Sequence, residues 1–233
     1  MNDRVVGRAA FLGILGAGLV GLAWGKQVSA FAGRFVPDQL EVVLPTKGWR
    51  IFTIRGIPRI DLARYRLRVT GLVERPLSLS LADLRSLPQV EQVSDFHCVT
   101  GWSVYDVQWR GIRFDDLLAE AGLKPEARWL RFISAEAPYV DTLSLEQARF
   151  PDAMLALDMD GKPLSKPHGS PARVVMPQMY GYKNVKWVTT IEVRSDFVPG
   201  YWETHGYDSD AWIGRSNFFI QEKTSDLYRR GKE

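Results

Sequence analysis

Apolar and polar side chains alternate along several short stretches of this chain, which is the pattern of half-buried β-strands. Residues 65–71 give the clearest case, since apolar side chains occupy every second position up to Val69 and Gly71 then marks a turn. The same pattern, together with enrichment in β-branched and aromatic residues, predicts further strands. They cover residues 90–96, 129–134, 140–143, 173–176 and 187–194.

Two other stretches follow the helical period instead. Residues 80–87 begin with a serine that can cap a helix and stop before Pro88, so a short helix is predicted there. Residues 114–121 end at Gly122, a residue type that suits the carboxyl terminus of a helix. Strands and short helices therefore mix without the strict alternation of a doubly wound sheet. This order predicts an α+β domain built on a mixed sheet.

The amino-terminal residues differ in composition from the rest. Residues 9–25 form an uncharged run rich in Leu, Gly and Ala, with Arg4 and Arg8 before it. A basic flank followed by such a run is typical of an export signal or a single membrane anchor, and its glycines disfavour a buried soluble helix. We therefore expect an export signal or anchor over residues 1–32 and one folded domain over residues 33–233.

Composition narrows the class of protein. Apolar residues make up 45% and charged residues 24%, an ordinary globular balance that indicates neither disorder nor many membrane spans. The net charge of +3 is small, and basic residues are scattered among acidic ones without the stacking pattern of a nucleic-acid surface. We expect a globular protein with no nucleic-acid partner.

The chain contains one cysteine, Cys98. A lone thiol cannot form an intramolecular disulfide, so it is buried apolar filler, a catalytic nucleophile or a single soft ligand to a metal. His97 precedes it, and the run Thr-Gly-Trp-Ser follows at residues 100–103. Polar neighbours and a glycine differ from the valine or leucine of a core strand, so they favour the two chemical roles.

Two blocks of sequence resemble the molybdopterin domain of the sulfite oxidase superfamily. Residues 96–103, Phe-His-Cys-Val-Thr-Gly-Trp-Ser, are similar to the loop whose cysteine sulfur ligates molybdenum in that family. Residues 168–187, which begin His-Gly-Ser-Pro-Ala-Arg and end Asn-Val-Lys-Trp, are similar to the segment that holds the pterin. The blocks occur in the family's order, and the resemblance is closest to stand-alone catalytic subunits without a fused haem domain.

The resemblance implies the family's fold and its cofactor, molybdenum held by molybdopterin. Cys98 is then the metal ligand and the catalytic residue, and a soft thiolate suits a redox metal. Arg173 and Lys186 are expected to hold the pterin's phosphate, because a guanidinium fork and an ammonium both bind phosphate oxygens. Other positions carried over from the family are expected to contact the cofactor. They are Phe52, Thr53, Ile54, His97, Ser134, His168, Asn184 and Val185.

Plainer interpretations of these residues stay open at this point. His97 can be a hydrogen-bonded structural residue. Arg173 and Lys186 can be ordinary surface charges, although both adjoin apolar strand segments where an unpaired charge is costly. A zinc triad of His97, His168 and His205 is disfavoured by the spacing, and no glycine-rich phosphate loop of standard pattern occurs.

The position four residues after the cysteine divides the superfamily. Sulfite oxidases carry an arginine there, which helps to bind a dianionic substrate, whereas this chain has Trp102. The form Cys-Val-x-x-Trp-Ser resembles the bacterial branch that reduces sulfoxides such as methionine sulfoxide. We therefore expect Trp102 to form an apolar wall for a sulfoxide, whether a small molecule or bound in a protein.

The resemblance also predicts an electron partner and a location. Since no haem-binding or flavin-binding segment is visible, electrons are expected to come from a membrane haem protein or another electron-transfer partner. A periplasmic protein, exported or tethered to the cytoplasmic membrane, is expected from the amino-terminal pattern. Two alternatives stay open: a sulfite-oxidising enzyme, and a non-catalytic binding protein that has kept the fold.

Overall fold

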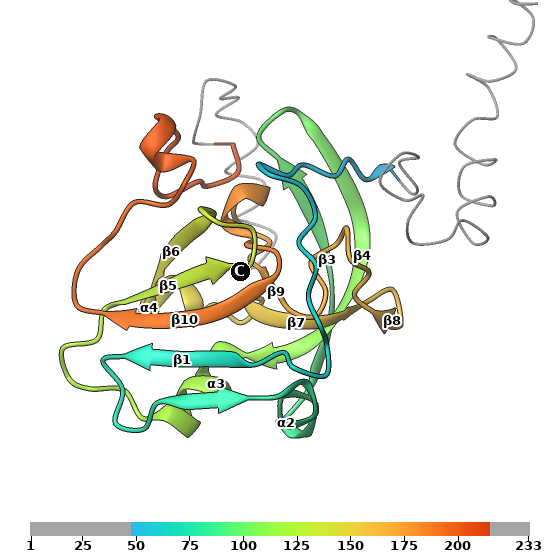
Figure 1. The fold of residues 1–233 in the computed structure, drawn as a ribbon. Coiled ribbons are helices and arrows are strands. Elements are labelled where there is room, and N and C mark those ends of the chain that lie inside the picture. Colours follow the sequence, from blue (N-terminus) through green and yellow to red (C-terminus); the bar gives the residue numbers. More distant parts are fainter. Residues whose placement is uncertain (1–47, 215–233) are drawn as a thin grey trace, which may run out of the picture. The chain divides into compact units, whose positions relative to one another are not determined.

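The computed structural model describes residues 48–214 (Figure 1). The chain divides into two compact units, Met1–Ile51 and Phe52–Glu233, and the helices and strands below belong to the second. The predicted export signal or anchor over residues 1–32 lies outside the described residues. Within residues 48–214, no helix is both long enough and apolar enough to cross a membrane.

Five strands form the first sheet, in the order β2-β1-β10-β5-β6. Strands β1 and β10 run parallel, and the other neighbouring pairs in this sheet are antiparallel. The sheet is therefore mixed, as the sequence predicts. Its strands are β1 (Leu67–Gly71), β2 (Leu77–Leu79), β5 (Trp129–Ser134), β6 (Val140–Ser144) and β10 (Val188–Arg194).

A second sheet is antiparallel throughout. Its strands are β3 (Val90–Cys98), β4 (Trp102–Arg113), β7 (Met154–Met159), β8 (Lys162–Pro163) and β9 (Arg173–Val175). Strands β3 and β4 make a long hairpin, whose turn lies at the opposite end of the domain from helices α2 and α3 in Figure 1. Strand β9 pairs with the amino-terminal half of β7, so the second sheet fixes the position of Arg173.

The helices are short. Helix α2 (Leu81–Ser86) begins after Ser80, which forms a capping box with Asp83, and helix α3 (Phe114–Ala121) ends at Gly122. Both helices predicted from the sequence are therefore confirmed. The other helical elements are α4 (Leu145–Ala148) and two short 3₁₀ helices, η2 (Gly181–Lys183) and η3 (Glu203–His205).

The sequence pattern predicts neither β4 nor β7. In β4, Asp106 has a positive φ of 55° and lies where the pairing with β3 shifts register, so the alternation of side chains is interrupted. Strand β7 is buried from Met154 to Asp158, so its apolar residues follow one another without alternation. Asp158 belongs to β7, and the turn that follows this strand is formed by Asp160 and Gly161.

One hydrophobic core joins the two sheets. Leu67 and Ile191 from the first sheet, Leu155 and Val174 from the second, and Leu117 from α3 belong to the same cluster of buried side chains. Full burial of such a side chain stabilises the fold by roughly 1.5 to 3 kcal/mol. The shared core therefore holds the ends of β5, β9 and β10 in a fixed relation, and the predicted site residues lie at or next to those ends.

Candidate active site

Arg173 is buried at the start of β9, with 2% of its surface exposed. Its Nη1 donates to the carbonyl of His168 at 3.1 Å, and its guanidinium lies 5.1 Å from the ring of Trp109 and 5.7 Å from that of Phe96. Among the described residues, no carboxylate forms an ion pair with it. Burial lowers the pKa of Arg173 to about 10, which leaves it charged at neutral pH. Arg173 is therefore not an ordinary surface charge.

Lys186 supplies a second cation close to the first. Its side chain is partly buried, its Nζ donates to the carbonyl of Phe52 at 2.8 Å, and it lies 4.1 Å from the ring of Trp187. Burial and then the charge of Arg173 lower the pKa of Lys186 to about 7, while Glu136 opposes this shift. Two cations near enough to repel each other, without an ion-paired carboxylate in the described part of the chain, favour a bound anion.

Gly169 separates these two cations. Its φ is +106°, and a Cβ atom built there would lie 3.0 Å from the Cβ of Lys186 and 3.1 Å from the Cβ of Arg173. A side chain at this position would therefore push the two cation-bearing residues apart. The carbonyl of Gly169 accepts a hydrogen bond from the backbone of Trp187 at 3.3 Å, which ties the two segments together. A guanidinium and an ammonium both bind phosphate oxygens, so two such residues on either side of one glycine fit a phosphate group.

Ser134, the last residue of β5, and Glu136, two residues later, lie next to the cation pair. The hydroxyl of Ser134 donates to the carbonyl of Lys186 at 2.8 Å and accepts from the backbone of Glu136 at 3.0 Å. The carboxylate of Glu136 accepts from the backbone nitrogens of Ile54 at 2.6 Å and Arg55 at 2.8 Å. The predicted early segment, Phe52, Thr53 and Ile54, is thereby attached to the predicted later residues Ser134 and Lys186. Thr53 itself is exposed.

Asn184, Val185 and His168 are buried. The side-chain oxygen of Asn184 accepts from the backbone N–H of Met176 at 2.7 Å, and the carbonyl of Val185 accepts from the backbone N–H of Val174 at 2.8 Å. These hydrogen bonds attach residues 184–185, which precede Lys186, to residues 174–176, which follow Arg173. In this structure Asn184 and Val185 thus shape the site, and their direct contact with a cofactor stays a prediction.

Cys98 is the last residue of β3, at the turn of the β3–β4 hairpin. Its side chain is half-buried, and its Sγ lies 3.2 Å from the hydroxyl of Thr100. Gly101 has a φ of +85° and donates its backbone N–H to the carbonyl of Cys98, which closes the turn. The thiol is therefore accessible at the tip of a hairpin, and the interpretation as fully buried filler does not hold.

Aromatic rings connect this hairpin to the cation pair. The ring of Trp102 lies 5.6 Å from that of Phe96 and 6.2 Å from that of Phe52. Phe96 in turn lies beneath the guanidinium of Arg173. The side chain of His97 is partly buried, which lowers its pKa although Asp95 opposes the shift, and its Nδ1 lies 2.7 Å from the hydroxyl of Ser103. A hydrogen-bonded structural role thus describes His97 as it stands.

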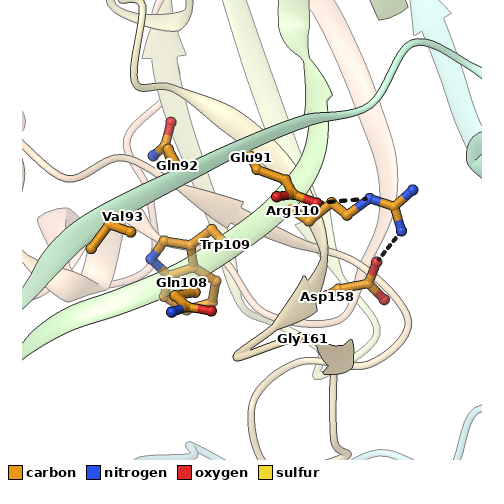
Figure 2. Close-up of a pocket in the computed structure, with 8 residues that line it drawn as sticks. All are labelled: Glu91, Gln92, Val93, Gln108, Trp109, Arg110, Asp158 and Gly161. Atoms are coloured by element: carbon orange, nitrogen blue, oxygen red, sulfur yellow. Dashed lines mark hydrogen bonds and ion pairs between the residues drawn. The ribbon is translucent and has the colours of Figure 1, made fainter.

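Figure 2 shows a separate pocket on the second sheet, with a volume of about 480 Å³. Its polar wall is an ion-pair chain in which Arg110 lies 3.7 Å from Glu91 and 3.5 Å from Asp158. None of the site residues predicted from the sequence lines this pocket, although Trp109, which lies under Arg173, forms part of it. The pocket is therefore not the candidate site.

Sequence reasoning missed several residues of the site. Trp109 lies under the guanidinium of Arg173, and Glu136 holds two backbone nitrogens of the early segment. Neither residue stands in a motif that marks its role. Lys183, at the end of the Tyr-Gly-Tyr-Lys run at residues 180–183, was missed as well, since its side chain is 0% exposed only in the folded chain. A buried lysine requires partners.

Comparison with known proteins gives a family match. The model of the family described as "Oxidoreductase molybdopterin binding domain" matches residues 54–202. Among curated proteins, the chain is 38% identical over 154 residues to an uncharacterized oxidoreductase, YuiH, of Bacillus subtilis, covering 65% of this chain and 77% of that protein.

Two further relatives widen the comparison. The chain is 33% identical over 189 residues to a putative protein-methionine-sulfoxide reductase subunit, YedZ1, of Azospira oryzae, covering 78% of this chain and 70% of that protein. Among solved structures it is similar to the sulfane dehydrogenase SoxCD of Paracoccus pantotrophus, with a TM-score of 0.57 and 31% identity. That match covers 60% of this chain and 41% of the other.

Proposed function

We propose a function from the premise that this chain belongs to the oxidoreductase molybdopterin binding domain family, whose model spans residues 54–202. Membership of the sulfite oxidase superfamily, expected from the sequence, is thereby confirmed, and with it a molybdenum-dependent oxidoreductase with a molybdopterin cofactor. Within that family we propose the reduction of a sulfoxide to a thioether.

One observation carries the proposal most directly. Arg173 and Lys186 form a pair of cations on either side of Gly169, and neither has an ion-paired carboxylate among the described residues. Phe96 and Trp102 connect this pair to the accessible thiol of Cys98. An anion-binding end and a thiolate end within one site fit a cofactor that carries both a phosphate and a metal.

Each residue has a separate role in this proposal. Arg173 and Lys186 hold the phosphate of molybdopterin, and Ser134 and Glu136 keep the segments around it together. Cys98 supplies the protein's thiolate to molybdenum. When bound, the molybdenum centre supplies two-electron oxygen-atom transfer. Reduction of one sulfoxide consumes two electrons and two protons and releases one thioether and one water.

The choice of a sulfoxide follows from the wall beside Cys98. Trp102 packs between Phe52 and Phe96 and stands where sulfite oxidases carry an arginine, so this position is an apolar wall and not a cation for a dianion. The curated relative from Azospira oryzae, described as a putative protein-methionine-sulfoxide reductase subunit, supports the same choice. Sulfite oxidation is the competing reaction, since curated sulfite oxidases are also among the chain's relatives.

The electron donor and the location complete the proposal. We propose a membrane haem protein or a similar carrier as the donor, acting on a periplasmic protein that is exported or tethered to the cytoplasmic membrane. The basic and apolar pattern of residues 1–32 supports this location.

Activity and metal content together test the proposal. The full chain, purified from a host that makes molybdopterin, is expected to contain molybdenum and to reduce methionine sulfoxide with a reduced dye as donor. Sulfite oxidation with a dye acceptor is expected to be slower. The Cys98→Ala variant is expected to lose turnover, since the thiolate that completes the metal's coordination is gone.

Three results would contradict this. A Cys98→Ala protein with full molybdenum content and activity would show that Cys98 is not the metal ligand. Efficient sulfite turnover without sulfoxide reduction would contradict the proposed reaction, while the assignment of the cofactor would stand. A folded wild-type protein without molybdenum or pterin would favour the non-catalytic binding protein instead.

A further inference from the structure

Three charged side chains that the proposed chemistry does not use meet in the protein interior. The ammonium of Lys183 on η2 donates to the carboxylate of Asp141 on β6 at 2.6 Å and to the carboxylate of Glu203 on η3. The three side chains are 0%, 2% and 4% exposed, respectively. We refer to Asp141, Lys183 and Glu203 as the buried triad. It joins three segments that are far apart in the sequence.

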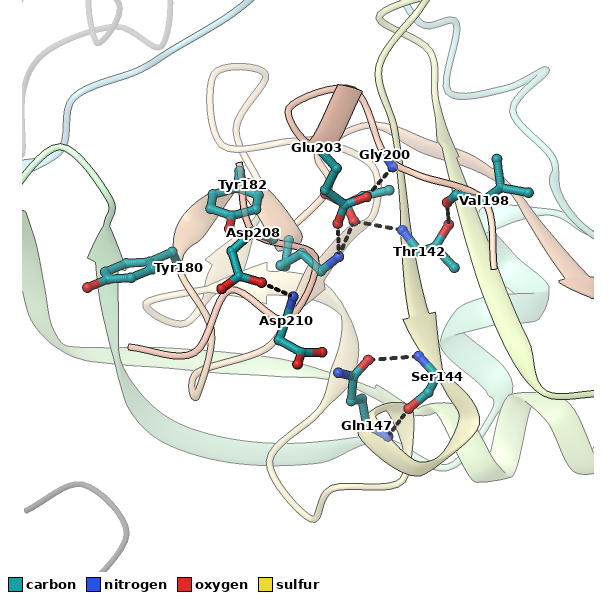
Figure 3. A network of polar contacts seen from close by, with 12 residues as sticks. Thr142, Ser144, Gln147, Tyr180, Tyr182, Val198, Gly200, Glu203, Asp208 and Asp210 are labelled. Carbon is teal, nitrogen blue, oxygen red and sulfur yellow. Dashed lines mark hydrogen bonds and ion pairs between the residues drawn. The ribbon is translucent and has the colours of Figure 1, made fainter. Parts of the chain in front are cut away.

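Residues 198–203 pack closely against the buried triad. Figure 3 shows the carboxylate of Glu203 turned toward the backbone nitrogen of Gly200, which donates to it. A Cβ atom at Gly200 would lie 2.9 Å from the carboxyl carbon of Asp141, so a side chain there would disturb the triad. Next to it, the hydroxyl of Thr142 donates to the carbonyl of Val198 at 2.7 Å. This segment is therefore attached to β6 at several points.

The buried triad is also continuous with the cation pair. Lys183 immediately precedes the turn Asn184–Val185–Lys186, and its carbonyl accepts from the backbone of Val185 at 3.1 Å. The other side of this turn is fixed to the strand of Arg173 through the 2.7 Å bond between Met176 and Asn184. A displacement of Lys183 would therefore move the backbone that carries Lys186.

We infer that Lys183 is a positioning residue for the molybdopterin site: held between Asp141 and Glu203, it fixes the turn that carries Lys186 toward the cofactor's phosphate. The inference deepens the proposed function and rests on it, because it concerns the same site.

Stability alone gives a weak reason for the triad. Replacing a buried ion pair with apolar residues of similar volume is often neutral or stabilising. Charged hydrogen bonds, in contrast, have a defined direction and length, so they set the position of the backbone that bears them. A lysine held by two carboxylates from separate segments is suited to position the turn.

The test replaces the charge and measures cofactor retention. Lys183→Met keeps the length and the apolar stem of the side chain but removes the ammonium. Supporting residues of a metal site typically change affinity by roughly 10- to 100-fold, and a loss of molybdopterin retention in that range is expected when cofactor is limiting. The readouts are molybdenum and pterin per folded protein, and the Mo(V) electron paramagnetic resonance spectrum of the loaded fraction.

Arg85→Met provides a matched control. Arg85 donates two hydrogen bonds, at 3.0 and 2.8 Å, to Asp158, whose side chain is 8% exposed, so the variant also breaks an ion pair with a buried carboxylate. It does not touch the turn before Lys186. Lower thermal stability is expected in both variants, whereas lower cofactor retention and an altered Mo(V) spectrum are expected in Lys183→Met alone.

The outcomes separate the possibilities. Equal losses of retention in both variants would overturn the inference, because instability would then account for them. An unchanged spectrum with full retention in Lys183→Met would overturn it too. If Lys183→Met does not fold, Glu203→Gln decides, since it keeps the pair of Lys183 with Asp141 and a smaller change in the same readouts is expected. Wild-type protein that folds without molybdenum would refute the proposed function itself.

Discussion

At the scale of single residues, the site is governed by two cations with little opposing charge. Arg173 is charged throughout the neutral range, since burial lowers its pKa only to about 10. Lys186 is divided between its two forms near neutrality, because burial and Arg173 lower its pKa to about 7. Both shifts show that the protein without a ligand bears an unfavourable charge. A bound phosphate relieves this cost and is thereby attracted.

Removing the deeper cation tests its role. Arg173→Ala is expected to lower cofactor occupancy, because loss of a charge-assisted hydrogen bond weakens binding by about 1.5 to 3 kcal/mol, or roughly 10- to 100-fold. Occupancy is measured on folded protein when cofactor is limiting. Arg131→Ala is the matched control, since Arg131 forms an ion pair with Glu192 at 3.3 Å and does not contact the site. Equal occupancy in Arg173→Ala and wild type would place the phosphate elsewhere.

The second cation predicts a pH dependence of binding. A phosphate favours the charged form of Lys186 and raises its pKa above the value of about 7 in the free protein. Binding then takes up a proton above about pH 7, so affinity is highest below that pH and falls as the pH rises. Lys186→Arg stays charged and is expected to give a flatter curve between about pH 7 and about pH 9. Cofactor loading of apo-protein measures this, and equal slopes would contradict it.

At the scale of elements, the sequence predicted those helices and strands whose pattern depends on contacts within the element itself. Ser80 marked the start of α2 because a capping serine bonds within its own turn. Strand β7 was not predicted because it is buried from Met154 to Asp158 on both its faces, so apolar and polar side chains do not alternate along it. Strand β4 was not predicted because Asp106, with its positive φ, interrupts the alternation of apolar and polar side chains. These features depend on residues distant in the sequence.

The same distinction applies to the candidate site. Arg173 and Lys186 stand in a motif, so their juxtaposition could be predicted. The role of Glu136 could not be predicted, because its partners are backbone nitrogens 82 and 81 residues away, and every residue type except proline has a backbone N–H. The buried triad was missed for a related reason, since the burial of Lys183 follows from how β6 and η3 pack around it.

The packing of η2 on the hairpin leads to a prediction for Gly181. A Cβ atom there would lie 2.3 Å from the ring of Phe96, which supports both Arg173 and Trp102. Gly181→Ala is therefore expected to destabilise the protein by about 1 to 3 kcal/mol through overpacking and to reduce cofactor occupancy. Denaturant titration measures the first effect and molybdenum content the second.

A second substitution distinguishes this cause from a backbone effect. Phe96→Leu removes the ring that the new methyl group would strike, so the double variant Gly181→Ala/Phe96→Leu is expected to lose less stability than the sum of the two single losses. Strict additivity of the two changes would mean that η2 and the hairpin do not meet as described.

At the scale of the whole molecule, the buried triad makes folding sensitive to pH. Burial raises the pKa of Asp141 to about 7, although Lys183 opposes the shift, whereas an aspartate in an unfolded chain titrates near about 3.9. The folded protein thus holds a proton that unfolding releases between about pH 4 and about pH 7. The contribution of Asp141 to the free energy of unfolding therefore falls as the pH rises through this window. Burial opposes the charged form of Lys183, but the two carboxylates raise its pKa. The contribution of Lys183 to the free energy of unfolding is therefore constant in this window and is lost only when the pH rises above the ordinary range of lysine.

Asp141→Asn isolates this contribution, because asparagine keeps the size and does not titrate. The difference between the unfolding free energies of wild type and Asp141→Asn is expected to decrease from about pH 4 to about pH 7 and then to level off. Asp196→Asn is the control: Asp196 is exposed, and hydrogen bonding to Arg194 lowers its pKa, so its effect lies below this window. Denaturant titrations of the apo-protein across this range provide the free energies. A difference that stays constant or rises with pH would show that Asp141 is already ionised in the folded protein, and Lys183 would then face two full negative charges.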